Sequence, residues 1–156
     1  MSSSPQDVDY QRLLQLRTDL RRFLHWSEEQ AAREGLTPAQ HQLLLAIRGH
    51  AGERGPTIGD AADSLLLRHH SAVGLVDRAV KAGLVERGQD GHDQRIVRLR
   101  LTPRGEELLE RLSAVHLEEL ERLAPRLREI WPGQDRPEPS GDMMDPTILE
   151  SEREKP

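Results

Sequence analysis

The sequence predicts a mainly α-helical fold with one small β-hairpin. Three observations carry this prediction. Apolar residues recur at helical spacing over most of residues 8–130, two short strand candidates follow the fourth such stretch, and Gly-rich or Pro-rich breaks separate the segments. With 156 residues and no internal repeat, the chain is expected to form one domain with a tail.

Composition excludes several classes of protein. The sequence contains no cysteine, so disulfides and thiol chemistry are excluded, and no apolar run approaches the roughly 20 residues of a membrane span. The first ten residues have neither a basic nor an apolar segment typical of a secretory signal. We therefore expect a cytoplasmic protein with no membrane partner.

Charge is distributed unevenly along the chain. The net charge is −5, yet residues 48–104 carry ten basic and seven acidic side chains, a net of +3. Residues 105–156 carry seven basic and fourteen acidic side chains. A polyanion responds to the local field, so the cationic central block is compatible with nucleic-acid binding despite the acidic whole.

Residues 8–34 are predicted to form a long amphipathic helix. No Pro or Gly interrupts residues 8–33, and steps of three and four residues separate most of the apolar positions Leu13, Leu16, Leu20, Phe23, Leu24 and Ala31. Because a chain this small offers too little core to cover such a helix, a second subunit is expected to cover part of it.

The next two helices have clear start signals. Thr37 and Gln40 form a capping-box pattern around Pro38, and Thr57 is followed by Asp60 at the same spacing. The first of these helices should end near Gly49, and residues 50–56 should form a loop. The run of three leucines at residues 65–67 breaks the helical period, which predicts a buried turn between two helices.

A fourth helix is predicted over residues 68–82, followed by a hairpin. The helix core set is Ala72, Leu75, Val76, Ala79 and Val80. Residues 84–87 and 96–101 are the strand candidates, and residues 88–95 are the exposed tip. On the second strand Val97, Leu99 and Leu101 should share one face, with Arg98 and Arg100 on the other.

A last long helix is predicted over residues 103–130, beginning at Thr102-Pro103. Its apolar positions are Leu108, Leu109, Leu112, Val115, Leu120, Leu123, Leu127 and Ile130. Pro125 should kink this helix or divide it in two. Residues 132–156 are rich in Pro and acidic residues without periodicity, which predicts a disordered acidic tail.

This order of elements is that of a winged helix-turn-helix over residues 36–103, between long N- and C-terminal helices. In such folds the N-terminal part of the second helix of the motif faces base edges in the major groove. The outer positions of residues 68–82 are therefore candidate DNA contacts, and Gly74 would permit close approach. The candidates on this helix are Arg68, His69, His70, Ser71, Gly74 and Arg78.

Other chemistries have weak support. The histidines show no metal-ligand spacing, adjacent His69 and His70 point in different directions on a helix, and no catalytic motif is present. We predict no metal, no cofactor and no enzyme activity. His25, Trp26 and His41, near the junction of the first two helices, are candidate ligand-binding residues, with a packing or interface role as the alternative.

The segment from residue 76 to residue 105 resembles the winged-helix signature of the MarR family of transcription regulators. The matching motifs are Val76-Asp77-Arg78-Ala79, Gly83-Leu84-Val85-Glu86-Arg87, Asp93-Gln94-Arg95 and Leu101-Thr102-Pro103-Arg104-Gly105. The flanking long helices agree, so the resemblance covers roughly residues 10–130 of the predicted domain, residues 8–130. Ala79 departs from the pattern, which usually has leucine at that position.

The resemblance implies a homodimer in which residues 8–34 and 103–130 form the dimerisation region. It also implies binding to double-stranded DNA at a palindromic operator, with Arg95 of the wing entering the minor groove and Asp93 orienting it. A repressor that responds to a small aromatic or phenolic effector is implied as well. The alternative is a winged-helix module that binds a protein and not DNA.

Overall fold

The computed structural model describes residues 4–130 and contains five helices and two strands. The predicted acidic tail lies outside the described residues. In chain order the elements are α1 Asp7–Arg33, α2 Pro38–Arg48, α3 Ile58–Leu65, α4 His69–Lys81, β1 Val85–Gln89, β2 Val97–Leu101 and α5 Pro103–Ile130. The predicted mainly α fold with a small β-wing is confirmed.

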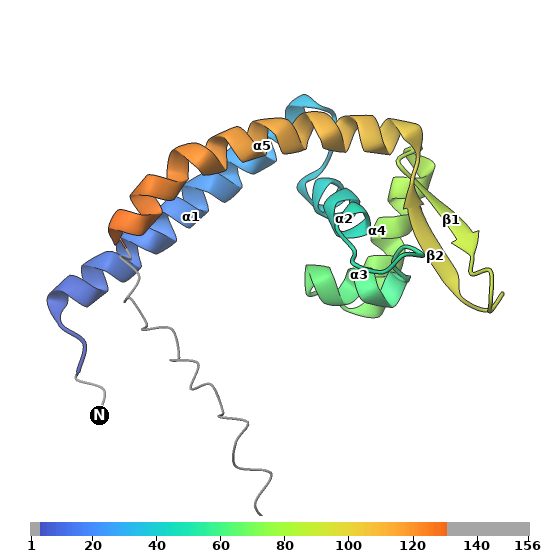
Figure 1. Ribbon diagram of the computed structural model, residues 1–156, viewed down its shortest axis with the longest axis horizontal. Coiled ribbons are helices and arrows are strands. Elements are labelled where there is room, and N and C mark those ends of the chain that lie inside the picture. The colour runs from blue at the N-terminus through green and yellow to red at the C-terminus, as the bar shows by residue number, and fades with distance from the viewer. Residues whose placement is uncertain (1–3, 131–156) are drawn as a thin grey trace, which may run out of the picture.

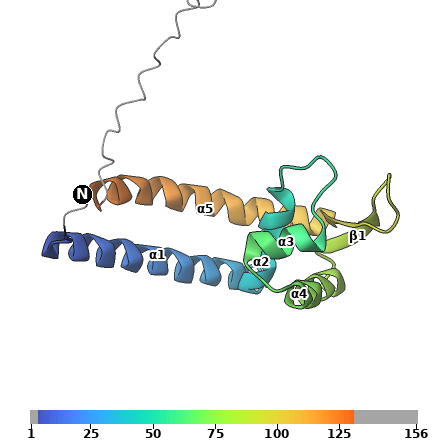
Figure 2. The ribbon, with the colours of Figure 1, turned by 90° about the horizontal axis from the view of Figure 1, so that it is seen from below.

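The molecule consists of a long arm and a compact unit at one end of it (Figure 1). The arm is made by α1 and α5, which lie side by side and run in opposite directions (Figure 2). The compact unit contains α2, α3, α4 and the two strands. The N-terminal half of α5 belongs to both parts, because Leu108, Leu109 and Leu112 are buried in the same core as α2 and α4.

The helix starts follow the sequence signals. The Thr37 hydroxyl accepts a hydrogen bond from the Gln40 backbone N–H at 3.1 Å, and the Thr37 N–H donates to the Gln40 side chain at 3.0 Å. Thr57 and Asp60 form the same reciprocal pair at 3.1 and 2.8 Å. Each pair satisfies N–H groups that a helix start otherwise leaves free.

The turn between α3 and α4 differs from the prediction of a buried turn. Leu66 adopts a left-handed conformation with φ 54° and is 93% exposed, while Leu67 is 38% exposed. The turn is closed by its backbone, since the Leu67 N–H donates to the Ala62 carbonyl at 2.9 Å. Only Leu65 of the three leucines packs against the core. Apolar character alone did not identify the side chains that face inward.

One further helical prediction is wrong, and of the two outcomes predicted at Pro125 the division into two helices does not occur. Val80 is 36% exposed and does not belong to the core, because it lies at the edge of the arc that Ala72, Leu75, Val76 and Ala79 bury. In addition, α5 continues through Pro125 without dividing. Pro125 is exposed and lies in the last two turns, where the carbonyl that loses its partner is accessible to water.

The two strands form an antiparallel hairpin in which Val85 pairs with Leu101 and Gln89 pairs with Val97. Leu99 is fully buried, and its N–H donates to the Pro56 carbonyl at 2.8 Å. The loop before α3 therefore lies along the free edge of β2. This contact places the loop beside the base of the wing.

A polar residue is buried inside the arm. Asp19 of α1 is 4% exposed and accepts hydrogen bonds from the Gln15 side chain at 3.1 Å. The guanidinium groups of Arg22 and of Arg126 on α5 lie 3.6 and 3.5 Å from the same carboxylate. This cluster joins α1 to α5 far from the compact unit.

The start of α5 packs closely against the end of α4. The Thr102 hydroxyl donates to the Gly83 carbonyl at 2.6 Å and accepts from the Gly105 N–H at 3.0 Å. A Cβ atom added at Gly105 would lie 2.2 Å from the Leu84 carbonyl oxygen. Since that neighbour is backbone, only glycine fits at this position without a shift of one of the two segments.

We predict that Gly105→Ala destabilises the protein by about 2–4 kcal/mol, because the new methyl group overpacks a backbone contact. Thermal unfolding measures this effect. Gly91→Ala is the matched control, since nothing lies within 4 Å of its added Cβ, and it should change the midpoint little. Equal melting temperatures for Gly105→Ala and the wild type would contradict the prediction.

Candidate nucleic-acid interface

The N-terminal end of α4 presents a continuous exposed surface. Arg68 is the N-cap residue, and the side chains of Arg68, His69, His70 and Ser71 are all exposed. The opposite face of α4 is buried in the core. The four residues predicted from sequence are therefore all accessible at the first turn of the helix. Their contact with DNA stays a prediction.

Gly74 and Arg78 lie one turn apart on α4. A Cβ atom at Gly74 would meet Arg78 Nη1 at 3.3 Å, so the guanidinium lies over the glycine. Arg78 is exposed and flexible enough to move aside. The site thus offers either a close approach to the helix backbone or a cation above it.

An ion pair connects α4 to the wing. Asp77 on α4 accepts a hydrogen bond from the Arg87 guanidinium on β1. Both side chains are partly exposed, so the attraction is screened and contributes modestly to stability. Its effect is geometric, because it fixes the direction of α4 relative to the hairpin.

The wing tip holds one arginine in a defined orientation. Arg95 Nε and Nη2 donate to the two Asp93 carboxylate oxygens at 3.1 and 3.0 Å, and the Arg95 backbone N–H donates to Asp93 Oδ1 at 3.0 Å. The bidentate bond lowers the pKa of Asp93 and raises the pKa of Arg95. The Arg95 side chain is nevertheless 90% exposed. It is oriented by its neighbour and accessible to a partner.

A buried carboxylate holds the base of the wing. Asp90 is 4% exposed and accepts hydrogen bonds from the His92 N–H at 2.8 Å, Arg98 Nε at 2.9 Å, and the Asp93 N–H and Arg54 Nη1 at 3.4 Å. The bond from the His92 N–H, followed by that from Arg98, lowers the pKa of Asp90 to about 2. One anion thereby joins the tip, β2 and the loop before α3.

Sequence reasoning missed Asp90 and misplaced Arg98. Arg98 was expected on an exposed basic face with Arg100, but its side chain is only 20% exposed. Besides Asp90, it bonds the Gly55 carbonyl at 3.3 Å and lies 4.0 Å from Asp60. Arg100 is exposed, as expected. The available signal was the Asp90-Gly91 pair, which is typical of a turn closed by the aspartate side chain.

Comparison with known proteins supports one family. The family model described as "MarR family" matches residues 34–96. A crystal structure of a MarR family transcription regulator superposes with a TM-score of 0.64 at 26% identity, covering 75% of this chain and 76% of the other. Residues 34–96 therefore match the MarR family, and the chain shares the fold of a MarR family regulator.

Other relatives agree with this assignment. Over 54 residues the chain is 39% identical to YsmB of Bacillus subtilis, an uncharacterized HTH-type transcriptional regulator. This aligned segment makes up 35% of this chain and 37% of the relative. The match thus spans little more than a third of that relative. Two solved structures share the fold. A MarR family protein from Bacillus stearothermophilus superposes with a TM-score of 0.68 at 23% identity, covering 78% of this chain and 82% of the other. The Staphylococcus aureus MepR–DNA complex superposes with a TM-score of 0.62 at 21% identity, covering 73% of this chain and 82% of the other.

The motif residues of this chain have identifiable physical roles. Asp77 and Arg87 join α4 to the wing, and Asp93 orients Arg95. Thr102 and Gly105 allow α5 to start directly against the end of α4. The spacing of the motifs therefore follows from the contacts that fix α4, the wing and α5 relative to one another.

The structure separates the three candidate ligand-binding residues. His41 on α2 is buried against His116 of α5 with ring centroids 4.9 Å apart, and Trp26 lies 4.8 Å from the same ring. Burial, followed by the charge of His116, lowers the pKa of His41. His25 points elsewhere: its side chain is 76% exposed and lies 3.4 Å from Glu29. The expected group of three is therefore a group of Trp26, His41 and His116.

The hydrogen bonds of His116 fix its place in this cluster. One ring nitrogen bonds the Leu112 carbonyl and the other bonds the Ser27 hydroxyl, both at 2.7 Å. Phe23 completes the cluster with an edge contact to the same ring. The cluster joins α1, α2 and α5 where the arm meets the compact unit.

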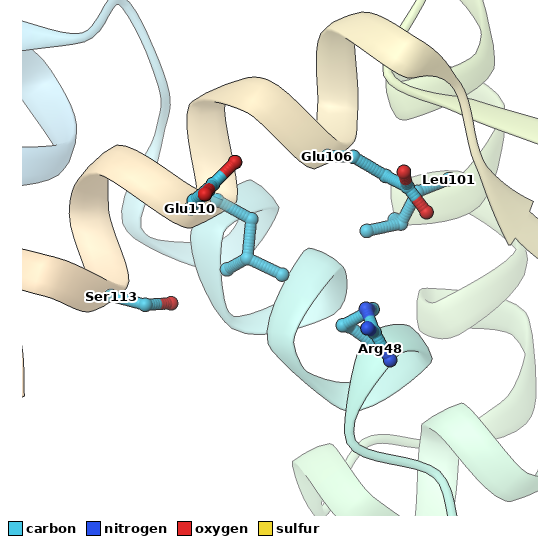
Figure 3. Close-up of a pocket in the computed structure, with 6 residues that line it drawn as sticks. Arg48, Leu101, Glu106, Glu110 and Ser113 are labelled. Atoms are coloured by element: carbon cyan, nitrogen blue, oxygen red, sulfur yellow. The ribbon is translucent and has the colours of Figure 1, made fainter.

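The cavities near this junction are small or open. A space of about 100 Å³ between α1 and α2 contacts His41 but neither Trp26 nor His25. A larger groove of about 440 Å³ lies between α2 and α5, where Arg48 faces Glu106 and Glu110 (Figure 3). Leu101, Leu109 and Ser113 complete its lining. The groove is more polar than a typical pocket for an aromatic ligand.

Residues 4–130 contain neither a candidate metal site nor a membrane-spanning helix. No three His, Asp or Glu side chains come together there in a way that could hold a metal ion. Within the same range, none of the helices combines the length and apolar character needed to cross a membrane.

We predict that Asp90→Asn lowers the unfolding midpoint by a few degrees at pH 7, because Arg98 loses its charged partner. The folded-state pKa of about 2 lies below the ordinary 3.8. The stability due to the Asp90 charge is therefore present above pH 4 and lost as the pH falls towards 2. Melting curves between pH 5 and 2 should show the wild type converging on Asp90→Asn.

Asp63→Asn is the matched control, since Asp63 is exposed on α3 and takes part in no ion pair within the described residues. Its melting temperature should stay close to that of the wild type. A difference between the wild type and Asp90→Asn that stays constant from pH 5 to pH 2 would contradict the assigned role.

Proposed function

We propose that the protein is a sequence-specific transcription regulator that binds double-stranded DNA as a homodimer at a palindromic operator. We further propose that it is a cytoplasmic repressor without catalytic activity, released from DNA by a small aromatic or phenolic effector. One observation carries the DNA-binding proposal. The exposed end of α4 and the exposed Arg95 are held on one rigid unit by Asp77–Arg87 and Asp90.

The chemistry of the exposed side chains fits DNA. Arginine can donate two hydrogen bonds to guanine, and histidine and serine can donate to bases or phosphates. An arginine that enters a narrow A·T-rich minor groove gains from the enhanced negative potential there. Staphylococcus aureus MepR, which shares the fold, forms a complex with DNA, and this supports the same role here.

The electrostatics of the central segment also support DNA as the partner. Among the ion pairs of the described residues, the carboxylates of Asp77, Asp90 and Asp93 each contact an arginine. These anions therefore add little free negative charge near the wing. Arg68 and Arg100 are exposed and take part in none of these pairs.

Exposed apolar side chains on the arm support the homodimer. Those on α1 are Val8, Tyr10, Leu13, Leu14, Leu20 and Leu24, and those on α5 are Val115, Leu117 and Leu120. At about 100° per residue, the tyrosine and the four leucines of α1 lie within about a third of the helix circumference. A second copy would bury this stripe, so residues 8–34 and 103–130 are the proposed dimerisation regions.

The position of the cluster around His116 supports effector control. It joins α1, α2 and α5, and α5 continues into the core that carries α4. A ligand that changed the packing at this junction would change the direction of the compact unit relative to the arm. Because each protomer carries one α4, the distance between the two recognition helices would change with it.

We predict that Arg95→Ala lowers operator affinity about 10- to 100-fold per protomer contact, with the dimer unchanged. Fluorescence anisotropy over a range of salt concentrations measures this loss. Arg12→Ala removes the same charge from the far end of α1 and should leave the affinity unchanged. Equal affinities for Arg95→Ala and the wild type would refute the role of the wing. If the wild type binds a partner protein and shows no salt-dependent binding to DNA, the alternative of a protein-interaction module is favoured.

We predict that Leu20→Glu dissociates the homodimer, because it places a charge in the proposed apolar interface. Leu20 is 47% exposed in the protomer, so the change should leave the protomer folded. Sedimentation velocity gives the oligomeric state and circular dichroism the helix content. Gln11→Glu, exposed on the same helix outside the apolar stripe, should remain dimeric. A dimeric Leu20→Glu protein would place the interface elsewhere.

A further inference from the structure

Leu66 combines two unfavourable features. It is the only residue other than glycine with positive φ among residues 4–130, at φ 54° and ψ 39°. This left-handed conformation is disfavoured for any residue with a Cβ atom. Leu66 is also 93% exposed, more than any other large apolar residue described.

Nothing inside the protomer compensates for these costs. Leu66 takes no part in the hydrophobic core, and the turn needs only its backbone, whose N–H donates to the Asp63 carbonyl at 3.2 Å. Glycine or asparagine would make the same turn with less strain. A strained residue that gains no internal contact is a candidate for contact with a partner.

The surroundings of Leu66 indicate the partner. Two residues later Arg68 caps α4, and the exposed surface continues through His69, His70 and Ser71. Leu67 adds a second partly exposed apolar side chain. Leu66 thus borders the surface that the proposed function places against the major groove.

The major groove offers an apolar side chain one specific target. Base edges there present hydrogen-bond donors and acceptors, and the thymine 5-methyl group is the apolar exception. We propose that Leu66 packs against a thymine methyl group in each half-site and is a specificity-determining residue. This inference rests on the proposed function and names one base that the operator should contain.

Substitution of deoxyuridine for thymine tests the contact, because it removes only the methyl group. Each thymine of a selected operator is replaced in turn, and affinity is measured for the wild type, Leu66→Gly and Leu66→Ala. For the wild type, one position per half-site should lose about fourfold in affinity, the factor expected for burial of one methyl group. Both variants should bind the thymine and deoxyuridine forms of that position equally.

The two variants separate the contact from the strain. Both remove the apolar side chain, but only glycine relieves the left-handed backbone. Leu66→Gly should therefore melt a few degrees above Leu66→Ala, while the two show the same loss of operator affinity. Leu45→Ala removes another exposed leucine, on α2, and should keep the full preference for thymine.

Two results would overturn the inference without affecting the proposed function. One is specific operator binding by the wild type that no deoxyuridine substitution weakens. The other is a thymine preference that persists in both Leu66 variants. A wild type that selects no DNA sequence would overturn the proposed function itself, before any variant is compared.

Discussion

The buried carboxylate of Asp90 is the interaction on which the geometry of the interface depends. It accepts bonds from the wing tip, from β2 and from the loop before α3, and the bonds from the His92 N–H and from Arg98 lower its pKa to about 2 because they stabilise the charged form. Through the backbone N–H groups of His92 and Asp93 it holds the loop that carries Arg95. A DNA-contacting side chain that is already oriented loses less conformational freedom on binding. The wing can therefore act as a defined element next to α4.

The same pairing explains how an acidic chain can present a cationic surface. The carboxylates of Asp77, Asp90 and Asp93 each contact an arginine, while Arg68 and Arg100 remain exposed. The net charge of −5 therefore describes the whole chain but not the surface around α4. The charge of the surface around α4 depends on which arginines are accessible. Arg98 is mostly covered and bonds Asp90, whereas Arg100 is exposed.

Local chemistry made most of the fold predictable. Capping pairs such as Thr57 with Asp60, and the helical spacing of the buried residues of α4, act within a few residues and can be read directly from the sequence. Predictions that depended on distant partners were less successful. Arg98 alternates correctly along its strand, yet its environment is set by Gly55 and Asp60, about forty residues earlier. Leu66 and Val80 were assigned inward because apolar character does not specify direction.

The ligand candidates show the same limit. The sequence placed Trp26 and His41 near one junction, but the residue that brings them together, His116, lies on α5. His25 precedes Trp26 by one position and points away, as adjacent helical residues do. Which residues share a junction is decided by the packing of α1 against α5, and that packing leaves no local signal.

Selection of bound DNA from a random-sequence pool tests the central claim most directly, since two copies of α4 and two wings should read one site together. We expect an inverted repeat with half-sites about one helical turn apart, flanked by A·T-rich segments where the wings reach the minor groove. Enrichment of an asymmetric sequence, or no enrichment at all, would contradict this mode of binding.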